Sequence, residues 1–526
     1  MTQHPPFDLQ PLEASPAGPV LAYLARNNTP VALVGGCVRD LMLARPTHDL
    51  DLAVEHGGLA LANELADSFG GAFYPMDAER DTGRALLYLN EDQPLVIDVA
   101  AWRATTLDED LHLRDFTINA MAIVLGETRP LLVDPLHGAQ DLENRLLKAA
   151  SDSAFADDPL RVLRAVRLLA ELAPLGFRLE EDTERQLHRF APLLAQVSIE
   201  RVRDELVRIL AAPWPGDWIV TLDSLSTLDI VLPETTALRG VSQSPPHIWD
   251  VFNHTMHVLD HAHALAAWIA GDDTTLAAAS LPWVASSLVQ ALGGRRAELA
   301  THLAEGEGAQ LRSRGQMLAW AGLCHDWGKP ATAQLEDDEA SGLAHWRFLG
   351  HPDVGAEMAY EALRRLRFNE AEARRVALIV RHHMRPLTLA AAGPPSRRAT
   401  FRYFRDLGDA GVDVALLSLA DVQGTYGDTL TPETWQPVLE TALSLLDSFF
   451  DARDQVVAPP PLVNGNDLMA HLHVAPGRHI GALLDAIAEA QAAGDIETPE
   501  QALVLATELA AHAVAPAQSA TSNGKG

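Results

Sequence analysis

The chain has 526 residues, 48% of them hydrophobic, and a formal net charge of −31 at pH 7. Its length predicts several domains with buried cores, and its negative charge argues against a basic coat that binds nucleic acid over the whole surface. The two cysteines lie far apart in the sequence, so we expect no disulfides. The chain shows neither a signal-peptide pattern nor an apolar run of about 18 residues, so we expect a cytoplasmic protein without a membrane partner.

The first part of the chain, from about residue 20 to residue 138, has a mixed α/β pattern. Short apolar runs predict strands at 31–34, 49–54, 85–89, 95–100 and 131–134. Helical spacing predicts helices near 20–27, 37–44 and 58–69. The proline-rich residues 1–19 are expected to be loose. This region therefore predicts a small mixed α/β head.

The rest of the chain, from about residue 139, has helical spacing almost throughout. The first helices are predicted at 157–173, 180–195 and 198–211, and linkers at 239–247 and 454–465. The resulting parts are a neck and body at 139–245, a second block at 246–450, a small unit at 465–513 and a disordered tail from Val514. The predicted fold class is α+β, with a mixed head followed by all-helical regions.

The head contains the sequence VGGCVRD at residues 34–40, followed shortly by HDLDLAV. A strand runs into Gly35 and Gly36, where the backbone can approach a phosphate closely. The next strand carries Asp49 and Asp51, and residues two apart on a strand point to the same side. Two carboxylates beside a glycine turn predict a site for Mg²⁺ and a nucleoside triphosphate.

Such a site would catalyse phosphoryl transfer with two metal ions. Asp49 and Asp51 would hold Mg²⁺ ions that activate an attacking 3′-hydroxyl and stabilise the leaving pyrophosphate. Arg39 would neutralise the phosphates. Asp98 lies on a later strand with apolar neighbours and is a candidate third carboxylate, because a buried aspartate is costly unless it is paired or bound to a metal. A structural, hydrogen-bonded aspartate is the alternative for this position.

Four more motifs follow in order. They are LRDFTINAMA at 113–122, DPLHGAQDL at 134–142, DDPLRVLRAVRLLA at 157–170 and SIERVRDEL at 198–206. Together with the first motif they resemble the signatures of the class II CCA-adding tRNA nucleotidyltransferases and of the related bacterial poly(A) polymerases. The resemblance implies template-independent addition of C, as CC or CCA, to the 3′ end of tRNA from CTP and ATP.

The fourth motif has a chemical logic of its own. Asp158, Arg161 and Arg164 are spaced i, i+3 and i+6, so one helix would place them near one face, where they could hydrogen-bond the Watson–Crick edge of a base. In the resembled family these positions select cytosine and adenine. Simple ion pairs to nearby carboxylates are the alternative for Arg164 and Arg167, which are grouped with the nucleotide-binding candidates.

The second motif supplies further nucleotide contacts and a departure from the family pattern. By resemblance, Arg114, Asp115 and Asn119 contact the sugar and the triphosphate. The first basic residue of the family's Arg-Arg-Asp is replaced here by Leu113.

A second departure concerns a loop. In many family members a flexible polar loop precedes this motif and assists the switch from adding C to adding A. Here only Ala104 and Thr105 separate VIDVAAWR from TLDEDLHLRDF. A short loop is found in enzymes that add CC only, so CC and CCA addition both stay open, with a separate A-adding enzyme as a partner in the first case.

The second helical block carries histidines and aspartates from separate helices. By resemblance to the HD phosphohydrolase superfamily, the four metal ligands are His254, His325, Asp326 and Asp421. Neutral imidazoles and carboxylates gathered in this way predict a site for a divalent metal of unknown identity.

Accessory residues accompany this HD site. Lys329 could bind a substrate phosphate, and His351 with His382 or His383 could complete a second metal site or contact phosphate. In some relatives the appended domain hydrolyses phosphoesters, and in others it serves as an RNA-binding scaffold.

Two regions could contact tRNA phosphates. The arginine-rich tract 361–405 is one, with a solvated helix face as its alternative. The other is the small unit 465–513, whose second helix begins near Gly477 and which could instead be a plain capping hairpin. Two other functions stay open for the whole chain: a poly(A) polymerase, and an HD phosphohydrolase whose head only binds a nucleotide or RNA.

Overall fold

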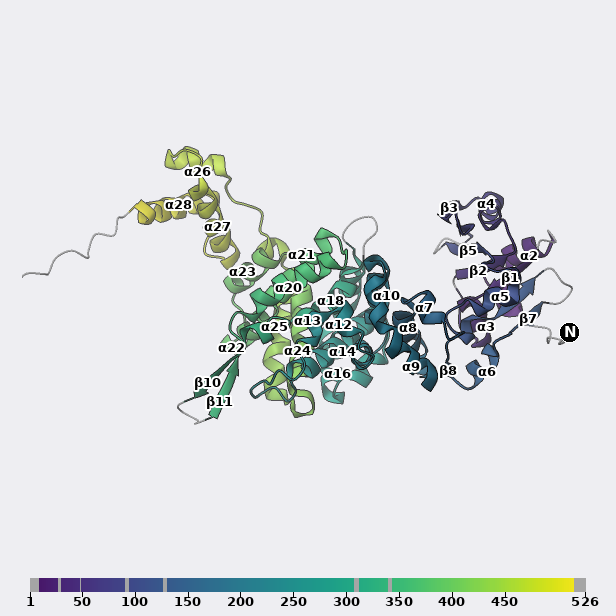
Figure 1. The fold of residues 1–526 in the computed structure, drawn as a ribbon. Helices are drawn as coiled ribbons and strands as arrows, with labels where there is room; N and C mark the ends of the chain where they lie inside the picture. The colour runs from purple at the N-terminus through teal and green to yellow at the C-terminus, as the bar shows by residue number, and fades with distance from the viewer. Residues whose placement is uncertain are drawn as a thin grey trace, which may run out of the picture. The chain divides into compact units, whose positions relative to one another are not determined.

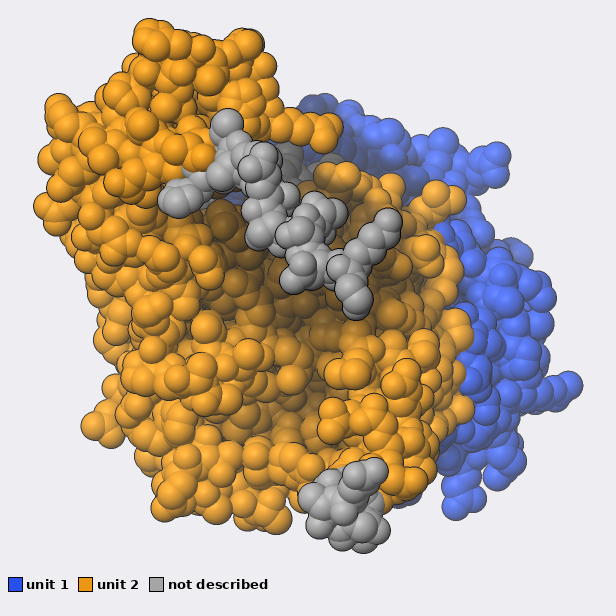
Figure 2. Space-filling model, turned by 90° about the vertical axis from the view of Figure 1, so that its left-hand side faces the viewer, with its two compact units in different colours: residues 1–209, 221–231 blue, residues 210–220, 232–526 orange. Residues whose placement is uncertain are grey.

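The computed structural model describes residues 9–26, 30–47, 49–89, 94–125, 130–306, 312–338 and 343–514 (Figure 1). The chain forms two compact units, which Figure 2 shows in different colours. Unit 1 comprises residues 1–209 and 221–231, and unit 2 comprises residues 210–220 and 232–526. Residues 515–526 of the predicted tail lie outside the described residues. None of the described helices combines the length and the apolar character needed to cross a membrane.

Unit 1 begins with a seven-stranded sheet, whose order is β3-β4-β5-β2-β1-β6-β7. Its strands are β1 (Val31–Val34), β2 (Asp49–Val54), β3 (Ala72–Asp77), β4 (Thr82–Leu87), β5 (Leu95–Ala101), β6 (Ala122–Leu125) and β7 (Leu131–Val133). All neighbouring strands are antiparallel except β2 and β5. In that parallel pair Asp51 lies opposite Asp98, so carboxylates far apart in the sequence meet in the sheet.

Five of these strands match the predicted ones within three residues. The apolar runs at β1 and β2 have the predicted bounds, and β1 is buried along its whole length. The sequence pattern did not predict β3, which has no buried residue and contains Pro75, or β6, which lies at the end of the LRDFTINAMA motif. The three predicted helices of the head are present as α2 (Gly18–Arg26), α3 (Gly36–Met42) and α4 (Gly58–Phe69).

Part of the N-terminal segment that we expected to be loose is ordered. The short helix α1 (Gln10–Glu13) precedes α2, and the side chains of Leu9, Leu12 and Ala17 are buried. These apolar residues explain why residues 9–19 pack against the head despite their prolines, because burying them stabilises the ordered segment. Residues 1–8 lie outside the described part.

The helices that follow the head are α7 (Ala154–Asp157), α8 (Arg161–Leu172), α9 (Glu181–Phe190) and α10 (Ile199–Ala211). The predicted helix 157–173 is therefore divided. Asp158 has extended backbone angles, φ −145° and ψ 96°. It precedes Pro159, and a proline disfavours helical angles in the residue before it. The prediction that Asp158 shares one helix with Arg161 and Arg164 was wrong.

Unit 2 is mostly helical. Its main helices are α14 (Val251–Ala270), α18 (Arg314–Cys324), α20 (His351–Arg365), α21 (Glu370–His382), α24 (Ala410–Tyr426) and α25 (Pro432–Phe450). Helix α24 is apolar around nearly its whole circumference and is buried from Ala410 to Thr425, packed against α14, α21 and α25. A β-hairpin, β10 (Gln334–Asp338) and β11 (Leu343–Arg347), interrupts the helical block and was not predicted.

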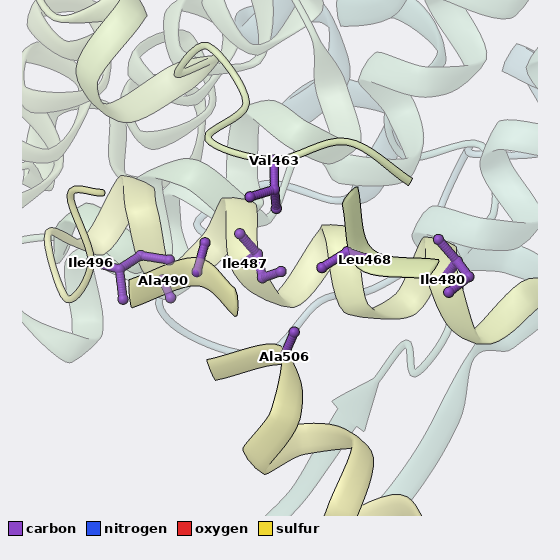
Figure 3. Close-up of a cluster of buried hydrophobic side chains, with 8 residues drawn as sticks. Val463, Leu468, Ile480, Ile487, Ala490, Ile496 and Ala506 are labelled. Atoms are coloured by element: carbon purple, nitrogen blue, oxygen red, sulfur yellow. The ribbon is translucent and has the colours of Figure 1, made fainter. Parts of the chain in front are cut away.

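The small C-terminal part of unit 2 is built from α26 (Gly465–Leu472), α27 (Arg478–Ala493) and α28 (Pro499–Val514). Figure 3 shows the apolar cluster that joins these helices, which includes Leu468, Ile480 and Ile487. Helix α23 (Arg397–Leu407) packs against α27, and Arg402 donates to Glu489 with a separation of 2.9 Å between Nε and Oε2. Some arginines of the predicted basic tract therefore hold the C-terminal helices in place.

Candidate functional site

Three carboxylates gather on two neighbouring strands of the head. Asp49 and Asp51 lie two residues apart on β2, and Asp98 lies opposite Asp51 on β5. Burial, and then the charge of Asp98, raise the pKa of Asp51 to about 6. A divalent cation relieves the repulsion between neighbouring carboxylates, so Asp49 and Asp51 could hold a metal ion here.

Arg84 is the nearest cationic partner of the third carboxylate. Its register position on β4 is opposite Asp98, and its guanidinium donates from Nε to Oδ1 at 2.7 Å and from Nη2 to Oδ2 at 2.8 Å. The hydrogen-bonded role considered for Asp98 is thus present in the structure. The paired carboxylate still faces Asp51 and adds to the negative charge at this point of the sheet.

The glycine turn approaches the carboxylates closely. Gly35 has a φ of +75°, and a Cβ placed there would lie 3.1 Å from Oδ2 of Asp51 and 3.3 Å from Nη1 of Arg114. A side chain is therefore excluded by both the backbone conformation and the space. The turn leads directly into α3, which begins at Gly36.

We expect Gly35→Ala to lower nucleotide addition by roughly tenfold, because the new Cβ would displace Asp51 and Arg114 by a few tenths of an ångström. Gly57→Ala is the matched control: Gly57 has a φ of +80°, but a Cβ there would meet nothing within 4 Å. Steady-state kinetics of both variants test the idea. Equal losses in the two variants would show that backbone strain alone, and not the crowding of Asp51, matters.

The candidate sugar and triphosphate contacts form a buried network. Arg39 donates from Nη1 to Oδ1 of Asn119 at 2.9 Å and also pairs with Asp40. Asn119 donates to Oδ1 of Asp115 at 3.2 Å, and Arg164 pairs with Oδ2 of Asp115 at 2.9 Å. The structure brings these residues together, and it gives Arg39 and Arg164 carboxylate partners of their own.

The candidate base-reading residues lie where α7 meets α8. Oδ2 of Asp158 accepts from Nη2 of Arg201 on α10 at 2.7 Å. Arg161 is buried and donates to main-chain carbonyls, including that of Leu113 at 2.7 Å. It therefore fixes the LRDFTINAMA segment, whereas Asp158 keeps a partly exposed carboxylate.

Arg167 makes the ion pairs considered as the alternative to base contact. Its Nε lies 2.7 Å from Oε2 of Glu205 on α10, and its Nη1 lies 2.6 Å from Oε1 of Glu171. The Arg167 side chain is 11% exposed and that of Glu205 is 10% exposed. The pair thus joins α8 to α10 in a buried setting.

Removing one partner of this pair is expected to weaken the region around α8. Arg167→Met should lower the local unfolding free energy by about 3 kcal/mol, because Glu205 would remain buried without its partner. Hydrogen exchange of the α8 amides measures this local value in a chain of several domains. The double variant Arg167→Met/Glu205→Leu should recover most of the loss. An equal loss in single and double variants would contradict the buried-charge explanation.

The histidine–aspartate residues of unit 2 meet in one buried cluster. His254 comes from α14, His325 and Asp326 follow α18, His351 begins α20, His383 follows α21, and Asp421 lies on α24. These helices lie in the same part of the fold (Figure 1). We call this set the HD cluster. It contains all four predicted ligands together with His351 and His383.

The described ranges contain two groups of three residues whose potential metal-ligand atoms all lie within 4.8 Å of one another inside the group. Both groups belong to the HD cluster. One group is His254, His325 and Asp421, and the other is Asp326, His351 and His383. Asp326 lies between them, with Oδ2 3.2 Å from Nε2 of His325 and Oδ1 3.5 Å from Nε2 of His351. The geometry suits one or two divalent ions.

The imidazole tautomers support this interpretation. Nδ1 of His351 lies 2.8 Å from the carbonyl of Phe348, and Nδ1 of His383 lies 2.7 Å from that of Val380. Carbonyls only accept, so both Nδ1 atoms are donors and both Nε2 atoms carry lone pairs in the neutral rings. These Nε2 atoms lie only 3.3 Å apart, and burial lowers the pKa of His383 to about 3. Two lone pairs at this distance repel each other unless a cation binds them.

A cavity of about 830 Å³ opens onto the HD cluster. Asp326, His351 and His383 line it together with Lys329, whose Nζ lies 2.7 Å from Oδ2 of Asp326. Lys329 therefore places its ammonium group beside the carboxylate of Asp326 at the wall of the cavity. His382 is absent from both ligand groups, and the structure assigns the second position of the pair, His383, to the cluster.

Several residues at these sites were missed. Arg84 and Arg201 pair with Asp98 and Asp158, yet nothing in their spacing pointed to those partners. His247 lines the HD cavity, and its ring lies 5.2 Å from that of His254. His247 falls in the predicted linker 239–247. Its position seven residues before His254 was the only feature of the sequence that could have indicated a place in this cavity.

Three family models match parts of the chain. They are described as the poly A polymerase head domain, matching residues 31–148, the probable RNA and SrmB-binding site of polymerase A, matching residues 176–238, and the HD domain, matching residues 295–422. The first contains the carboxylates of the head. The third contains all of the HD cluster except His254.

Curated relatives match most of the chain. An A-adding tRNA nucleotidyltransferase of Deinococcus radiodurans is 34% identical over 90% of this chain and 93% of its own length. A CC-adding tRNA nucleotidyltransferase of Thermus thermophilus is 31% identical over 89% of this chain and 91% of its own.

Solved structures share the fold. The complex of a CCA-adding enzyme with ATP has a TM-score of 0.59 at 20% identity and covers 97% of this chain and 100% of its own. A Thermotoga maritima CCA-adding enzyme complexed with tRNA has a TM-score of 0.55 at 20% identity, with the same coverage of both chains.

Proposed function

The chain belongs to the tRNA nucleotidyltransferase family, and we propose that it adds cytidine to the 3′ end of tRNA without a nucleic-acid template. The observation that carries the proposal is the meeting of Asp49, Asp51 and Asp98 on two strands beside the Gly35 turn. This is the arrangement that nucleotidyl transfer requires, because carboxylates must hold cations next to a backbone that can admit a triphosphate.

Asp49 and Asp51 would bind Mg²⁺, which when bound lowers the pKa of the attacking 3′-hydroxyl and offsets charge on the leaving pyrophosphate. Asp98, held by Arg84, would add negative charge behind them. Gly35 and Gly36 would give the phosphates access to the backbone. The chain's own contribution is therefore a negatively charged site on two interior strands, where sheet register places Asp51 opposite Asp98.

The second motif would hold the sugar and triphosphate. Arg114 lies beside Asp51 and Gly35, so it is the arginine best placed to meet the phosphates. Arg39 would act by positioning Asn119 and, through it, Asp115, because its guanidinium already binds Asp40 and Asn119. The three residues would thus orient the ribose by a connected set of hydrogen bonds.

Asp158 and Arg164 would read the base, since both side chains are partly exposed while Arg161 is buried against the main chain. Asp158 would exchange its bond to Arg201 for one to an amino group of cytosine. Arg161 would position the LRDFTINAMA segment, and Arg167 would hold α8 against α10. Base selection would then depend on Asp158 and Arg164, which the bend at Pro159 places on different segments. It would not depend on one continuous face of a helix.

CC addition is the specificity that we favour. The structure has only a short connection between β5, which ends at Ala101, and α5 (Leu107–His112), so it lacks room for the long polar loop expected of enzymes that add both bases. A separate A-adding enzyme would complete the tRNA end. The relatives named for A addition and for CC addition are similarly close, and A addition to tRNA ending in CC is accordingly the second candidate.

A tRNA transcript that ends before its CCA sequence tests these alternatives. With Mg²⁺, CTP and ATP we expect a product ending in CC, resolved to single nucleotides on a gel. A parallel transcript already ending in CC should remain unextended. Extension of only the second transcript would establish A addition, a product ending in CCA would establish both activities, and a long ladder from ATP would identify a poly(A) polymerase.

The HD cluster would form a metal-dependent phosphoesterase site. The paired lone pairs of His351 and His383 call for a cation, and Lys329 lies where it would bind the phosphate of a substrate in the adjoining cavity. The metal, when bound, would polarise the phosphoryl group and activate water. The alternative for the whole chain is an HD hydrolase whose head only binds RNA. The variant Asp51→Asn distinguishes this hydrolase from a tRNA nucleotidyltransferase.

The domain organisation follows from these assignments. We place the catalytic head at 20–138, the neck and body at 139–245, the HD domain at 246–450 and the small C-terminal unit at 465–513. The neck, body and C-terminal unit would bind tRNA, and the chain would work in the cytoplasm, where its free buried cysteines stay reduced.

A further inference from the structure

Lys329 is a buried cation of the HD site, and two different acceptors hold its ammonium group. The residue is 6% exposed and lines the HD cavity. Its Nζ lies 2.7 Å from Oδ2 of Asp326 and donates to Oε1 of Gln243 at 2.6 Å. A buried ammonium is costly unless acceptors satisfy it, so these two contacts decide where the charge lies.

The two acceptors differ in their relation to the metal ligands. The same Oδ2 of Asp326 lies 3.2 Å from Nε2 of His325 and 3.4 Å from Nε2 of His254. Lys329 therefore shares this oxygen with the ligand atoms of the HD cluster. Gln243 belongs to neither ligand group, so it gives Lys329 an acceptor that does not depend on the metal.

The orientation of the Gln243 amide follows from its two partners. Its Nε2 lies 3.3 Å from the carbonyl of Trp249, which can only accept, and its Oε1 faces Lys329, whose ammonium can only donate. The opposite orientation would set donor against donor at one end and acceptor against acceptor at the other. The amide therefore has one orientation, with its oxygen toward the cation.

The segment that carries Gln243 is anchored on two sides. It is the predicted linker before α14, and it closes onto the start of that helix, because the amide of Val251 donates to the carbonyl of Val241 at 2.9 Å. On the other side, Oγ of Ser244 accepts from the amide of Trp346 on β11 at 2.6 Å. The linker thus forms an ordered wall of the HD site, from which Gln243 reaches Lys329.

We propose that Gln243 is a positioning residue of the HD phosphoesterase site and that it acts through Lys329. This inference rests on the proposed function of the HD cluster. Oε1 of Gln243 would hold the ammonium at the cavity wall, where it meets the phosphate of the substrate. Because glutamine is neutral, the contact orients Lys329 without cancelling its charge, whereas a carboxylate at this position would offset that charge and repel a phosphate.

Hydrolysis of p-nitrophenyl phosphate by the full chain tests this role. We expect Gln243→Met, which removes the acceptor at similar volume, to raise KM and the inhibition constant of inorganic phosphate each by roughly tenfold. The value of kcat should change less than about twofold, because the lost contact acts on binding in the ground state and the transition state alike. Gln243→Glu should raise both constants further, since it keeps an acceptor but adds a negative charge. A purely structural role predicts the opposite order, with Gln243→Glu closer to the wild type.

A double variant shows whether Gln243 acts through Lys329. In the Lys329→Met background, Gln243→Met should have little further effect, because residues that act through one contact have non-additive effects. Gln243→Met should also retain the metal content of the wild type. Gln436→Met is the matched control and should leave the kinetics unchanged, since Gln436 is exposed on α25, donates to Glu440 at 2.9 Å and does not line the cavity.

Unchanged KM and phosphate inhibition in Gln243→Met would overturn the assignment. Equal losses with and without Lys329, or a loss of bound metal, would also overturn it. A wild-type chain that hydrolyses neither p-nitrophenyl phosphate nor 2′,3′-cyclic AMP would give a different result, because it would refute the proposed function of the HD cluster and the role of Gln243 with it.

Discussion

The Asp51→Asn enzyme is expected to lose nucleotide addition by roughly a thousandfold, while it keeps its fold. Asp51 lies at the centre of the carboxylate group, opposite Asp98 and two residues from Asp49. Removing one metal-binding charge weakens the stabilisation of the transferred phosphoryl group by several kcal/mol, and each 1.36 kcal/mol corresponds to about a tenfold change in rate. Single-turnover assays with CTP and a tRNA ending before CCA measure this loss directly.

The stability of the variant should not fall. Burial and the neighbouring Asp98 raise the pKa of Asp51 to about 6, so the folded state disfavours the charged form. For a carboxyl group whose pKa is raised on folding, ionisation costs stability above that pKa, and neutral asparagine avoids this cost at pH 7. Unfolding monitored by circular dichroism should therefore give an unchanged or higher midpoint, which separates catalysis from folding.

Glu55→Gln is the matched control, since Glu55 directly follows β2 and is exposed. It should retain full activity. If Asp51→Asn added nucleotides at the normal rate, the proposal for the head would fail, and the chain would be better described as an HD hydrolase with a nucleotide-binding head. Phosphoesterase activity in the same preparation should be unaffected by either change, because the HD cluster lies in the other unit.

Features determined by neighbouring residues could be predicted from the sequence. The apolar run 31–34 and the alternation at 49–54 place Asp49 and Asp51 on one strand, and the two glycines require the tight turn that follows β1. The four ligands of the HD cluster, by contrast, were identified by resemblance to the HD phosphohydrolase superfamily, and the structure brings them together from separate helices. A local pattern limits the geometry of the head strongly, whereas the HD cluster depended on the resemblance.

Features that depend on distant register could not be predicted. The pair between Arg84 and Asp98 exists because β4 and β5 align in one register, and a slip by one residue would turn Arg84 to the other face of the sheet. The contact between Arg201 and Asp158 depends in the same way on how α10 packs. The bend at Asp158, in contrast, had a local signal in Pro159 that the helical spacing of the motif obscured.

His382 and His383 are adjacent in the sequence, but only His383 lies in the HD cluster. His383 follows α21 and contributes Nε2 to the HD cluster, whereas His382 is the last residue of that helix and is only partly buried outside the cluster. We expect His383→Gln to lower phosphoesterase activity at least roughly a hundredfold and to reduce the bound metal, because loss of a ligand weakens both affinity and activation of water. His382→Gln should change neither.

Metal content by inductively coupled plasma spectrometry and hydrolysis of p-nitrophenyl phosphate and 2′,3′-cyclic AMP distinguish the two variants. The pair of variants is informative because both change the same residue type one position apart, so helix propensity and surface charge are matched.

The repulsion between Nε2 of His351 and Nε2 of His383 predicts a further effect on stability. Removing the metal with a chelator should destabilise the wild-type cluster. The variant His383→Gln should reduce this effect, because glutamine can give His351 a donor in place of a lone pair. If both variants kept full metal and activity, the second ligand group would be structural, and catalysis would be confined to His254, His325 and Asp421.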